Sequence, residues 1–583
     1  MKTHFSAIIL RIILPSFITI LSLSVASCKK EQIKETPKTP ITLEIKEVTA
    51  TTVTFEGHIE VDENLIEQSK VTVEFYSDSN IYDKIHEETH VDENGDYIIF
   101  IDFVEFGTTF HCTATLDTGE KTVSTEVTDF TTNSLSIEVS ATATSASAHI
   151  TGSLKGYSEK DAANITAGLL WGDNKDEVEA GNGTKETIQI AGDGSFDLDL
   201  ADLTYLTEYY IRPFFVFNSE SFYSEIYQFS TEDAYRHNVD LTVATDLSSS
   251  ETANCYIISK DGIYKIKAVK GNGNESVGEV ASCKVLWETF GTLEDIHPGD
   301  LVPNISYENG YIGFEASDRH GNALIAATDT EGNVLWSWHL WFTEEPQGQV
   351  YYNDAGTMMD RNLGATSATP GKVETLGLTY QWGRKDPFVG VASISYFKTP
   401  VKATADVYYY EACDQTTGTI EYATAHPATF IINEQIPYDW IYREEGSTAD
   451  NTLWQSSKTI FDPCPAGWRV PDGGENGVWA KASGNTGLIT TKFSSSVEGI
   501  YFTGIFGDDV IFYPAHGFRD RRDGRHVNTG SLSSWWSVTS TGDYPYMAYG
   551  FFQYGEFYTA YNKNTRATRA SGWSVRCFKI TSK

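Results

Sequence analysis

The chain has 583 residues, a formal net charge of −37 and a hydrophobic fraction of 40%. At about 150 residues per domain, this length predicts roughly four domains. The apolar content excludes a disordered chain, and the acidic balance excludes a general nucleic-acid binder, which needs basic contacts to phosphates.

The first 27 residues are typical of an export signal. An apolar run over residues 7–26 is interrupted by Arg11 and Pro15, which favours a removable signal over a membrane-spanning helix. The run ends in Val25-Ala26-Ser27-Cys28, which resembles the lipobox of bacterial lipoproteins. The resemblance implies a lipid on Cys28 and an outer-membrane anchor with the protein exposed at the cell surface. The alternative is a plain signal before an unmodified cysteine.

Residues 28–40 predict a flexible polar tether.

Composition divides the rest of the chain in two. Residues 41–232 hold 37 acidic and 9 basic residues, and of the 13 tryptophans only Trp171 lies before residue 233. The acidic front part therefore predicts a solvated spacer. The tryptophan-rich back part can form large cores and aromatic binding surfaces.

The front part contains an internal repeat, over residues 41–133 and 134–232. Asn94-Gly95-Asp96-Tyr97 precedes Asp193-Gly194-Ser195-Phe196 by 99 residues. Period-two alternation of apolar residues predicts half-buried strands in both copies, and each Gly-containing turn predicts a hairpin. This pattern resembles immunoglobulin-like or fibronectin type III-like sandwiches. Cys112 aligns with Ile211 at the same offset, so we expect a buried thiol there and no bridge.

His86-Glu87-Glu88-Thr89-His90 matches the His-Glu-x-x-His pattern of zinc proteases. That chemistry requires a helix, on which both histidines share one face. The surrounding β pattern predicts a strand or loop instead. We expect no metal and no other cofactor.

Residues 233–349 predict a third β-rich domain, with strands near residues 255 and 262. Trp336, Trp338 and Trp341 lie here at spacings of two and three residues. They either pack in a core or line a surface.

From residue 350 onward several distinctive motifs follow one another. They are Asp360-Arg361-Asn362-Leu363-Gly364, Tyr380-Gln381-Trp382-Gly383-Arg384, Asp462-Pro463-Cys464-Pro465-Ala466-Gly467-Trp468 and Gly572-Trp573-Ser574-Val575-Arg576-Cys577. In this order they resemble the Fibrobacter succinogenes major paralogous domain family, over residues 350–583. That family is similar in turn to the C-type lectin-like fold, a loop-rich α+β domain whose two ends meet. The expected fold class is therefore mainly β and multidomain, with tandem β-sandwiches followed by such an α+β domain.

The resemblance implies a disulfide between Cys464 and Cys577, with two separate thiols as the alternative. A short helix is expected over residues 475–482. A Cys255–Cys283 pair is also plausible in an exported chain, whereas the partner of Cys413 stays open.

Two groups of residues are candidates for ligand binding. Trp535, Trp536 and Tyr544 would offer flat faces to sugar rings, although paired tryptophans often pack inside. Arg519 and Arg522 belong to a basic loop that could bind carboxylate or sulfate groups. Interleaved aspartates leave a self-neutralised turn as the alternative. We expect four further charged residues to form internal ion pairs: Asp360, Arg361, Arg384 and Asp386.

The carboxylate motifs of calcium-dependent sugar-binding lectins are missing from the sequence, as are nucleophile elbows and phosphate loops. We therefore predict a lipid-anchored surface protein that is not an enzyme and that binds an extracellular glycan or surface protein, in recognition or adhesion. One alternative is an accessory or tip subunit of a surface fibre with protein partners. Another is a hydrolase with a carboxylate pair, which the sequence does not single out.

Overall fold

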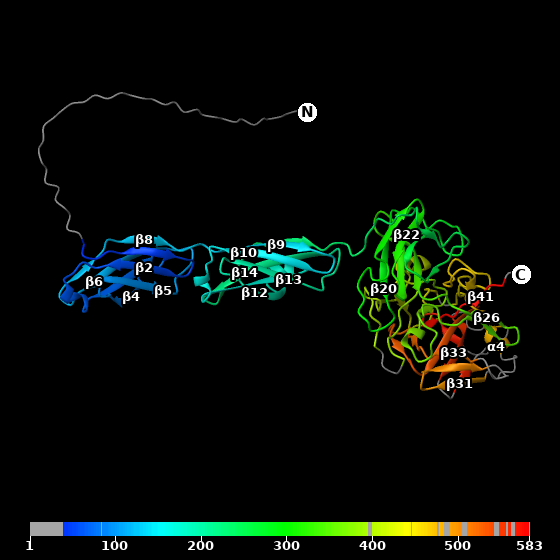
Figure 1. Ribbon diagram of the computed structural model, residues 1–583. Helices are drawn as coiled ribbons and strands as arrows, with labels where there is room; N and C mark the ends of the chain where they lie inside the picture. Colours follow the sequence, from blue (N-terminus) through cyan, green and yellow to red (C-terminus); the bar gives the residue numbers. More distant parts are fainter. Residues whose placement is uncertain are drawn as a thin grey trace, which may run out of the picture. The chain divides into compact units, whose positions relative to one another are not determined.

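The computed structural model describes residues 39–82, 84–394, 399–444, 446–474, 477–482, 490–503, 510–540, 547–554, 558–560 and 566–581. The described chain is mainly β, as predicted, with short helices between strands (Figure 1). Within these residues we find no helix whose length and apolar content would let it cross a bilayer. The chain divides into two compact units, one before and one after residue 230, with two short segments of the second sandwich (residues 143–148 and 201–208) grouped with the later unit.

The first sandwich has two sheets. One sheet has the order β1 (Glu44–Val48), β2 (Val53–His58), β5 (Asp96–Ile101). The other has the order β4 (Ile85–His90), β3 (Lys70–Ser77), β6 (Thr109–Asp117), β7 (Thr122–Ser124), with β8 (Thr128–Thr131) also on β6 and helix α1 (Glu63–Ile66) before β3. Alternate residues of β3 and β6 face inward and are buried, including Cys112 at 1% exposure. The predicted buried thiol is confirmed.

The second sandwich repeats this topology, which confirms the predicted tandem. Its first sheet has the order β13 (Ser195–Leu200), β10 (Ala148–Lys155), β9 (Ser136–Ala143). Its second sheet has the order β12 (Thr184–Ile188), β11 (Ile165–Gly172), β14 (Glu208–Phe217), β15 (Glu220–Tyr223), with β16 (Tyr227–Ser230) on β14 and helix α2 (Lys175–Glu179) between β11 and β12 (Figure 1).

The two glycine turns do not close hairpins, so that prediction is wrong. Gly95 and Gly194 have φ near +85°, as the turn signals require. The strands that they join, β4 to β5 and β12 to β13, belong to opposite sheets of each sandwich. A turn signal fixes the local backbone but not the partner of the next strand.

A buried carboxylate joins the two sandwiches. Asp161, in the 3₁₀ turn Glu159–Asp161 of the second copy, is 0% exposed. Its Oδ1 accepts hydrogen bonds from Thr49 Oγ1 at 2.6 Å and from Thr51 N and Oγ1, each at 2.7 Å. Between the same two sandwiches, the rings of Phe103 and Phe217 stack with centroids 5.0 Å apart. The carboxylate is thus satisfied by the first sandwich, as a buried charge must be.

The unit from residue 230 onward begins with a third pair of sheets. The first has the order β17 (Thr245–Asp246), β19 (Gly262–Lys267), β22 (Tyr311–Ala316), β21 (Asn304–Glu308). The other has the order β18 (Cys255–Ile258), β24 (Val334–Phe342), β23 (Gly321–Thr328), β20 (Ser282–Thr289). Trp336, Trp338 and Trp341 of β24 are all at most 2% exposed, so they pack in the core and line no surface.

Residues 348–581 continue from this pair. One sheet has the order β25 (Gly348–Tyr351), β26 (Gly356–Met359), β41 (Phe578–Lys579), β30 (Trp468–Arg469). The largest has the order β35 (His526–Val527), β34 (Phe518–Arg519), β40 (Gly572–Ser574), β36 (Leu532–Ser540), β37 (Met547–Tyr554), β38 (Tyr558–Ala560), with β27 (Thr379–Gln381) on β40 and β39 (Arg566–Thr568) on β37. The small sheets are β28 (Tyr410–Ala412) with β29 (Phe430–Ile432), and β31 (Thr490–Ser494), β32 (Gly499–Thr503), β33 (Val510–Pro514). The helices are the 3₁₀ turn Val373–Thr375, α3 (Ile420–Ala425) and α4 (Val478–Ala482).

The two domains predicted at residues 233–349 and 350–583 form one compact unit, which we call the head. Trp341 donates a hydrogen bond to the Ala365 carbonyl at 3.1 Å, and Asn322 donates to the Gly364 carbonyl at 3.0 Å. One apolar cluster runs from Trp341 across both parts to the disulfide-bonded Cys577. The pairing of β26 with β41 brings the two ends of residues 348–581 together, as expected. Assignment to the C-type lectin-like fold stays a prediction.

The predicted disulfide Cys464–Cys577 is present, and it closes a loop of 113 residues within the head. The pairing of Cys255 with Cys283, which the sequence left open, does not occur, because both are buried free thiols. They lie on different strands and pack in different apolar clusters.

Candidate functional site

The two tryptophans proposed as a sugar platform lie in the core. Trp535 and Trp536 are 0% exposed on strand β36. Trp535 donates through Nε1 to Asn362 Oδ1 at 2.9 Å, and Trp536 donates to the Tyr380 carbonyl at 2.6 Å. The Trp536 ring also stacks on Trp573, with centroids 4.7 Å apart. A ring enclosed in this way cannot stack on a ligand, so the structure contradicts the prediction for both residues. Tyr544 lies outside the described residues.

Arg519 is also buried, which corrects its prediction as a ligand-binding residue. Its guanidinium lies 4.5 Å from the Phe430 ring centroid. Its Nε donates to the Gly524 carbonyl at 2.8 Å, and Nη1 donates to the Val407 carbonyl at 3.3 Å. Burial lowers the pKa of Arg519 to about 10, so it stays cationic at neutral pH. Arg519 therefore stabilises, from its buried position, the turn that contains Gly524.

That turn is a hairpin between β34 and β35, and it is the exposed part of the basic loop. The Asp520 N–H donates to the Arg525 carbonyl at 2.8 Å, and Gly524 takes a φ of +66° that closes the turn. Arg522 is 63% exposed and donates to both carboxylate oxygens of Asp520, at 3.0 and 2.6 Å. Arg525 is 82% exposed, and its Nε lies 3.9 Å from Asp523. Of the two predicted arginines, only Arg522 is accessible to a ligand.

Two neighbouring segments extend the hairpin into a mixed surface. Arg521 donates through Nη1 to the Asn433 carbonyl at 3.1 Å, which ties the hairpin to the loop over residues 433–438. Ile436 in that loop is 74% exposed. Tyr410 of β28 is 46% exposed and adjoins Gly524, where an added Cβ would lie 3.4 Å from the Tyr410 Cβ.

We call Tyr410, Ile436, Arg521, Arg522 and Arg525 the arginine surface. Tyr410 and Ile436 were not predicted from the sequence, because they lie about 85 to 115 residues away from these arginines in the chain.

Carboxylates balance the charge of the arginine surface. The hydrogen bond to Asp520 raises the pKa of Arg522 above its usual value, and Asp523 and Glu434 add to this effect. Tyrosine and arginine are, with tryptophan, enriched among the residues that carry most binding energy at protein interfaces. An anionic group on a ligand would bind here by sharing or replacing the Asp520 contact.

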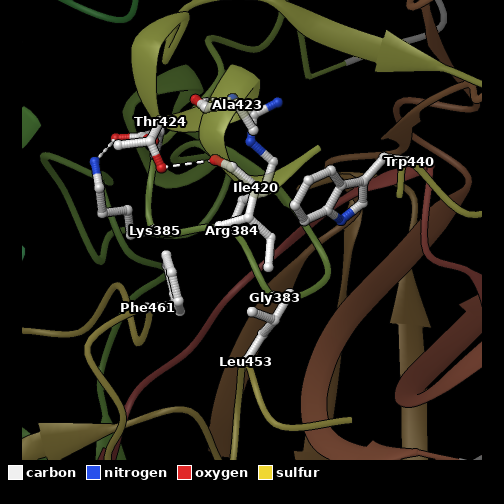
Figure 2. A pocket seen from close by; sticks show the side chains of 10 residues that line it. Gly383, Arg384, Lys385, Ile420, Ala423, Thr424, Trp440, Leu453 and Phe461 are labelled. Atoms are coloured by element: carbon white, nitrogen blue, oxygen red, sulfur yellow. Dashed lines mark hydrogen bonds and ion pairs between the residues drawn. The ribbon is translucent and has the colours of Figure 1, made fainter. Parts of the chain in front are cut away.

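A small internal cavity lies beneath α3 in the same head (Figure 2). Arg384 reaches toward Ala423 and donates to the Thr429 carbonyl at 2.8 Å, so it ties down the chain after the helix. Lys385 contacts Asp386 at 2.6 Å and Ser337 Oγ at 2.5 Å. The cavity volume of about 10 Å³ holds about one water molecule, so we assign it a structural role.

Internal ion pairs were predicted for four residues around this region, in part correctly. Arg361 contacts Asp360 at 2.9 Å. Asp386 pairs with Lys385, whereas Arg384 hydrogen-bonds to backbone carbonyls. Lys385, which precedes Asp386 directly in the sequence, thus contacts the carboxylate in place of Arg384.

The His86–His90 motif lies on strand β4, which confirms the strand prediction and removes the helix that zinc-protease chemistry needs. Across the part of the chain that the structure describes, no cluster of three or more histidine, cysteine or acidic side chains could hold a metal ion.

No family model and no curated protein matches the chain. Solved structures that resemble parts of it include the sensor domain of the anti-sigma factor RsgI4 in Pseudobacteroides cellulosolvens, at 17% identity over 17% of this chain and 76% of that one, with a TM-score of 0.15. A two-domain fibronectin type III segment from chicken tenascin matches at 16% identity over 33% and 97%, with a TM-score of 0.16. The FN1–FN3 domains of chicken CNTN1 match at 13% identity over 33% and 67%, with a TM-score of 0.14. At TM-scores this low the likenesses add nothing to the sheet topology described above, and membership of the major paralogous domain family stays a prediction.

Proposed function

We propose that this chain is a lipid-anchored cell-surface protein whose head binds an extracellular glycan with acidic groups through the arginine surface. The observation that carries the proposal is the exposure of Arg522 and Arg525, at 63% and 82%, beside exposed Tyr410 on a strongly acidic chain. The two sandwiches serve as the spacer, residues 41–232. Cys28, the proposed lipid site in the outer membrane, lies outside the described residues.

The chemistry of the arginine surface supports reversible recognition without a catalytic step. A guanidinium binds a carboxylate or sulfate through two parallel hydrogen bonds. The Tyr410 ring and the Ile436 side chain supply apolar area beside the charges. The buried Arg519 side chain donates to the Gly524 carbonyl and so stabilises the conformation of the hairpin. Because the hairpin is already ordered, little conformational entropy is lost when a ligand binds.

A glycan array tests the proposal with a soluble chain of residues 39–583. We expect binding to uronic-acid or sulfated glycans that survives EDTA. Arg522→Ala combined with Arg525→Ala should weaken binding at least tenfold. Arg236→Ala is the matched control, because Arg236 is also an exposed arginine (58%) paired with a carboxylate, Glu315, in the same head.

Three results would contradict the proposal. Equal binding by the double variant and the wild type would place the ligand elsewhere. A blank array with a folded head would favour a protein partner, as in a surface fibre. Loss of binding in EDTA would reveal a metal-dependent site that the proposal lacks.

A further inference from the structure

Strand β5 of the first sandwich carries apolar side chains on both of its faces. Tyr97, Ile99 and Ile101 point inward and are at most 6% exposed. Ile98 and Phe100 point outward and are 62% and 53% exposed. In the described part of the chain β5 has one strand neighbour, β2, so it forms the end of its sheet. Natural edge strands usually carry charges or proline on the exposed face, because a bare edge invites another strand.

The second sandwich shows that its fold does not require this apolar pair. Ninety-nine residues later, strand β13 holds Asp197 and Asp199 at the positions of Ile98 and Phe100. Asp199 contacts His149 at 2.7 Å across the sheet. The inward face of β13 is still apolar, with Phe196 6% exposed. The two copies therefore share the buried face and differ on the outward one, where the second copy has the usual protection and the first does not.

We propose that β5 is a strand-addition site for an extended segment of another polypeptide. Backbone hydrogen bonds along the open edge would hold the segment, and alternate side chains would set its specificity. Ile98 and Phe100 favour apolar residues opposite them. Asp96, 61% exposed although it contacts His58 at 2.8 Å, and exposed Asp102 flank the pair and favour lysine or arginine at the segment's ends.

Charge disfavours a second copy of this chain as the occupant. In the symmetric antiparallel pairing centred on Ile99, Ile98 would lie opposite Phe100 of the second chain, but Asp96 would lie opposite Asp102. Like charges directly opposite one another are destabilising. Residues 41–232 also hold 37 acidic against 9 basic residues, so two spacers repel each other. A cationic partner segment meets none of these obstacles.

Fluorescence anisotropy with labelled peptides tests this site on residues 39–583. The probe is the capped peptide Lys-Thr-Val-Thr-Val-Thr-Lys. We expect saturable binding, and at least tenfold weaker binding of Glu-Thr-Val-Thr-Val-Thr-Glu, whose charges repel the site. Lys-Thr-Val-Pro-Val-Thr-Lys should also bind at least tenfold more weakly, because proline lacks a backbone N–H for the ladder.

The decisive variant is Ile98→Asp combined with Phe100→Asp, which copies the second sandwich and should abolish binding of the lysine peptide. The matched control is Tyr82→Asp with Val127→Asp, two exposed apolar residues elsewhere on the same sandwich (94% and 58%), which should leave binding unchanged. No saturable binding by wild type, or equal binding by the Ile98/Phe100 variant with an unchanged circular dichroism spectrum, would overturn the proposal. A dimer in sedimentation that the same variant dissolves would assign the edge to a second copy and also overturn it.

Discussion

In the spacer, three histidines lie at the surface with an aspartate within 2.6–2.8 Å of each: His58, His111 and His149. In the head, three other histidines are at least 95% buried: His339, His516 and His526. The hydrogen bond to Asp129, then that to Asp78, raises the pKa of His111. Burial lowers the pKa of each of the three head histidines to about 3. His111 in the spacer is thus stabilised as a cation, whereas the three buried head histidines are stabilised as neutral rings.

The difference follows from the two architectures. A small sandwich buries the inward faces of two sheets, and its polar groups can stay outside. The head buries long irregular segments whose carbonyls need donors. Buried arginines supply them: Arg384 to Thr429, Arg519 to Gly524 and Arg569 to Asp450, all at 2.7–2.8 Å. We therefore expect the head to be sensitive to changes in charge and covalent structure that the spacer tolerates.

Removal of the disulfide should give the largest effect. Cys464→Ala with Cys577→Ala opens a 113-residue loop, which should lower the free energy of unfolding of the head by about 5 kcal/mol in the chain-entropy model. Calorimetry checks this in one scan, by comparing the unfolding transitions of the head and the spacer. The spacer transition is the control, because its only cysteine, Cys112, is a free thiol. A head transition that stays in place without the disulfide would contradict the prediction.

The spacer should show a comparable sensitivity at one point only, the joint between its sandwiches. Asp161→Ala leaves three donors of Thr49 and Thr51 without their acceptor, which should cost about 2–3 kcal/mol of spacer stability. Asp199→Ala is the control, because the Asp199 side chain is 80% exposed in its pair with His149, and it should not measurably shift the transition. Equal shifts of the spacer's unfolding transition in both variants would contradict the prediction that Asp161 matters more for stability than a surface carboxylate.

Much of the fold could be predicted from the sequence, whereas the site was largely missed. Alternation in β3 and the 99-residue offset predicted the tandem sandwiches, because both depend on local patterns. The crossing turns at Gly95 and Gly194 could not be predicted, because sheet partners are set by packing of distant strands. Trp535 and Arg519 were predicted at the surface but are buried. The sequence alone does not distinguish an aromatic or arginine side chain in a core from one on a surface. Only Arg522 of the predicted ligand contacts with described side chains is exposed.

The central claim, that burial keeps three head histidines neutral whereas two aspartates favour the protonated form of His111 in the spacer, is tested most directly by calorimetry of residues 39–583 at pH 7 and pH 5. Each head histidine has a folded pKa of about 3, below the unfolded value of about 6.5, so its contribution to stability is present above pH 6.5 and is lost as the pH falls. Between pH 7 and pH 5 this amounts to about 2 kcal/mol for each histidine.

Asp439, whose pKa burial raises to about 6, acts in the opposite direction and offsets about 1 kcal/mol. Burial also raises the pKa of Glu288 and of Asp462, and both act in the same direction as Asp439.

We therefore predict that the head transition moves to lower temperature at pH 5, whereas the spacer transition holds or rises, because pairing with Asp129 and Asp78 favours protonated His111. A head transition that rises on acidification, or two transitions that fall together, would contradict this account.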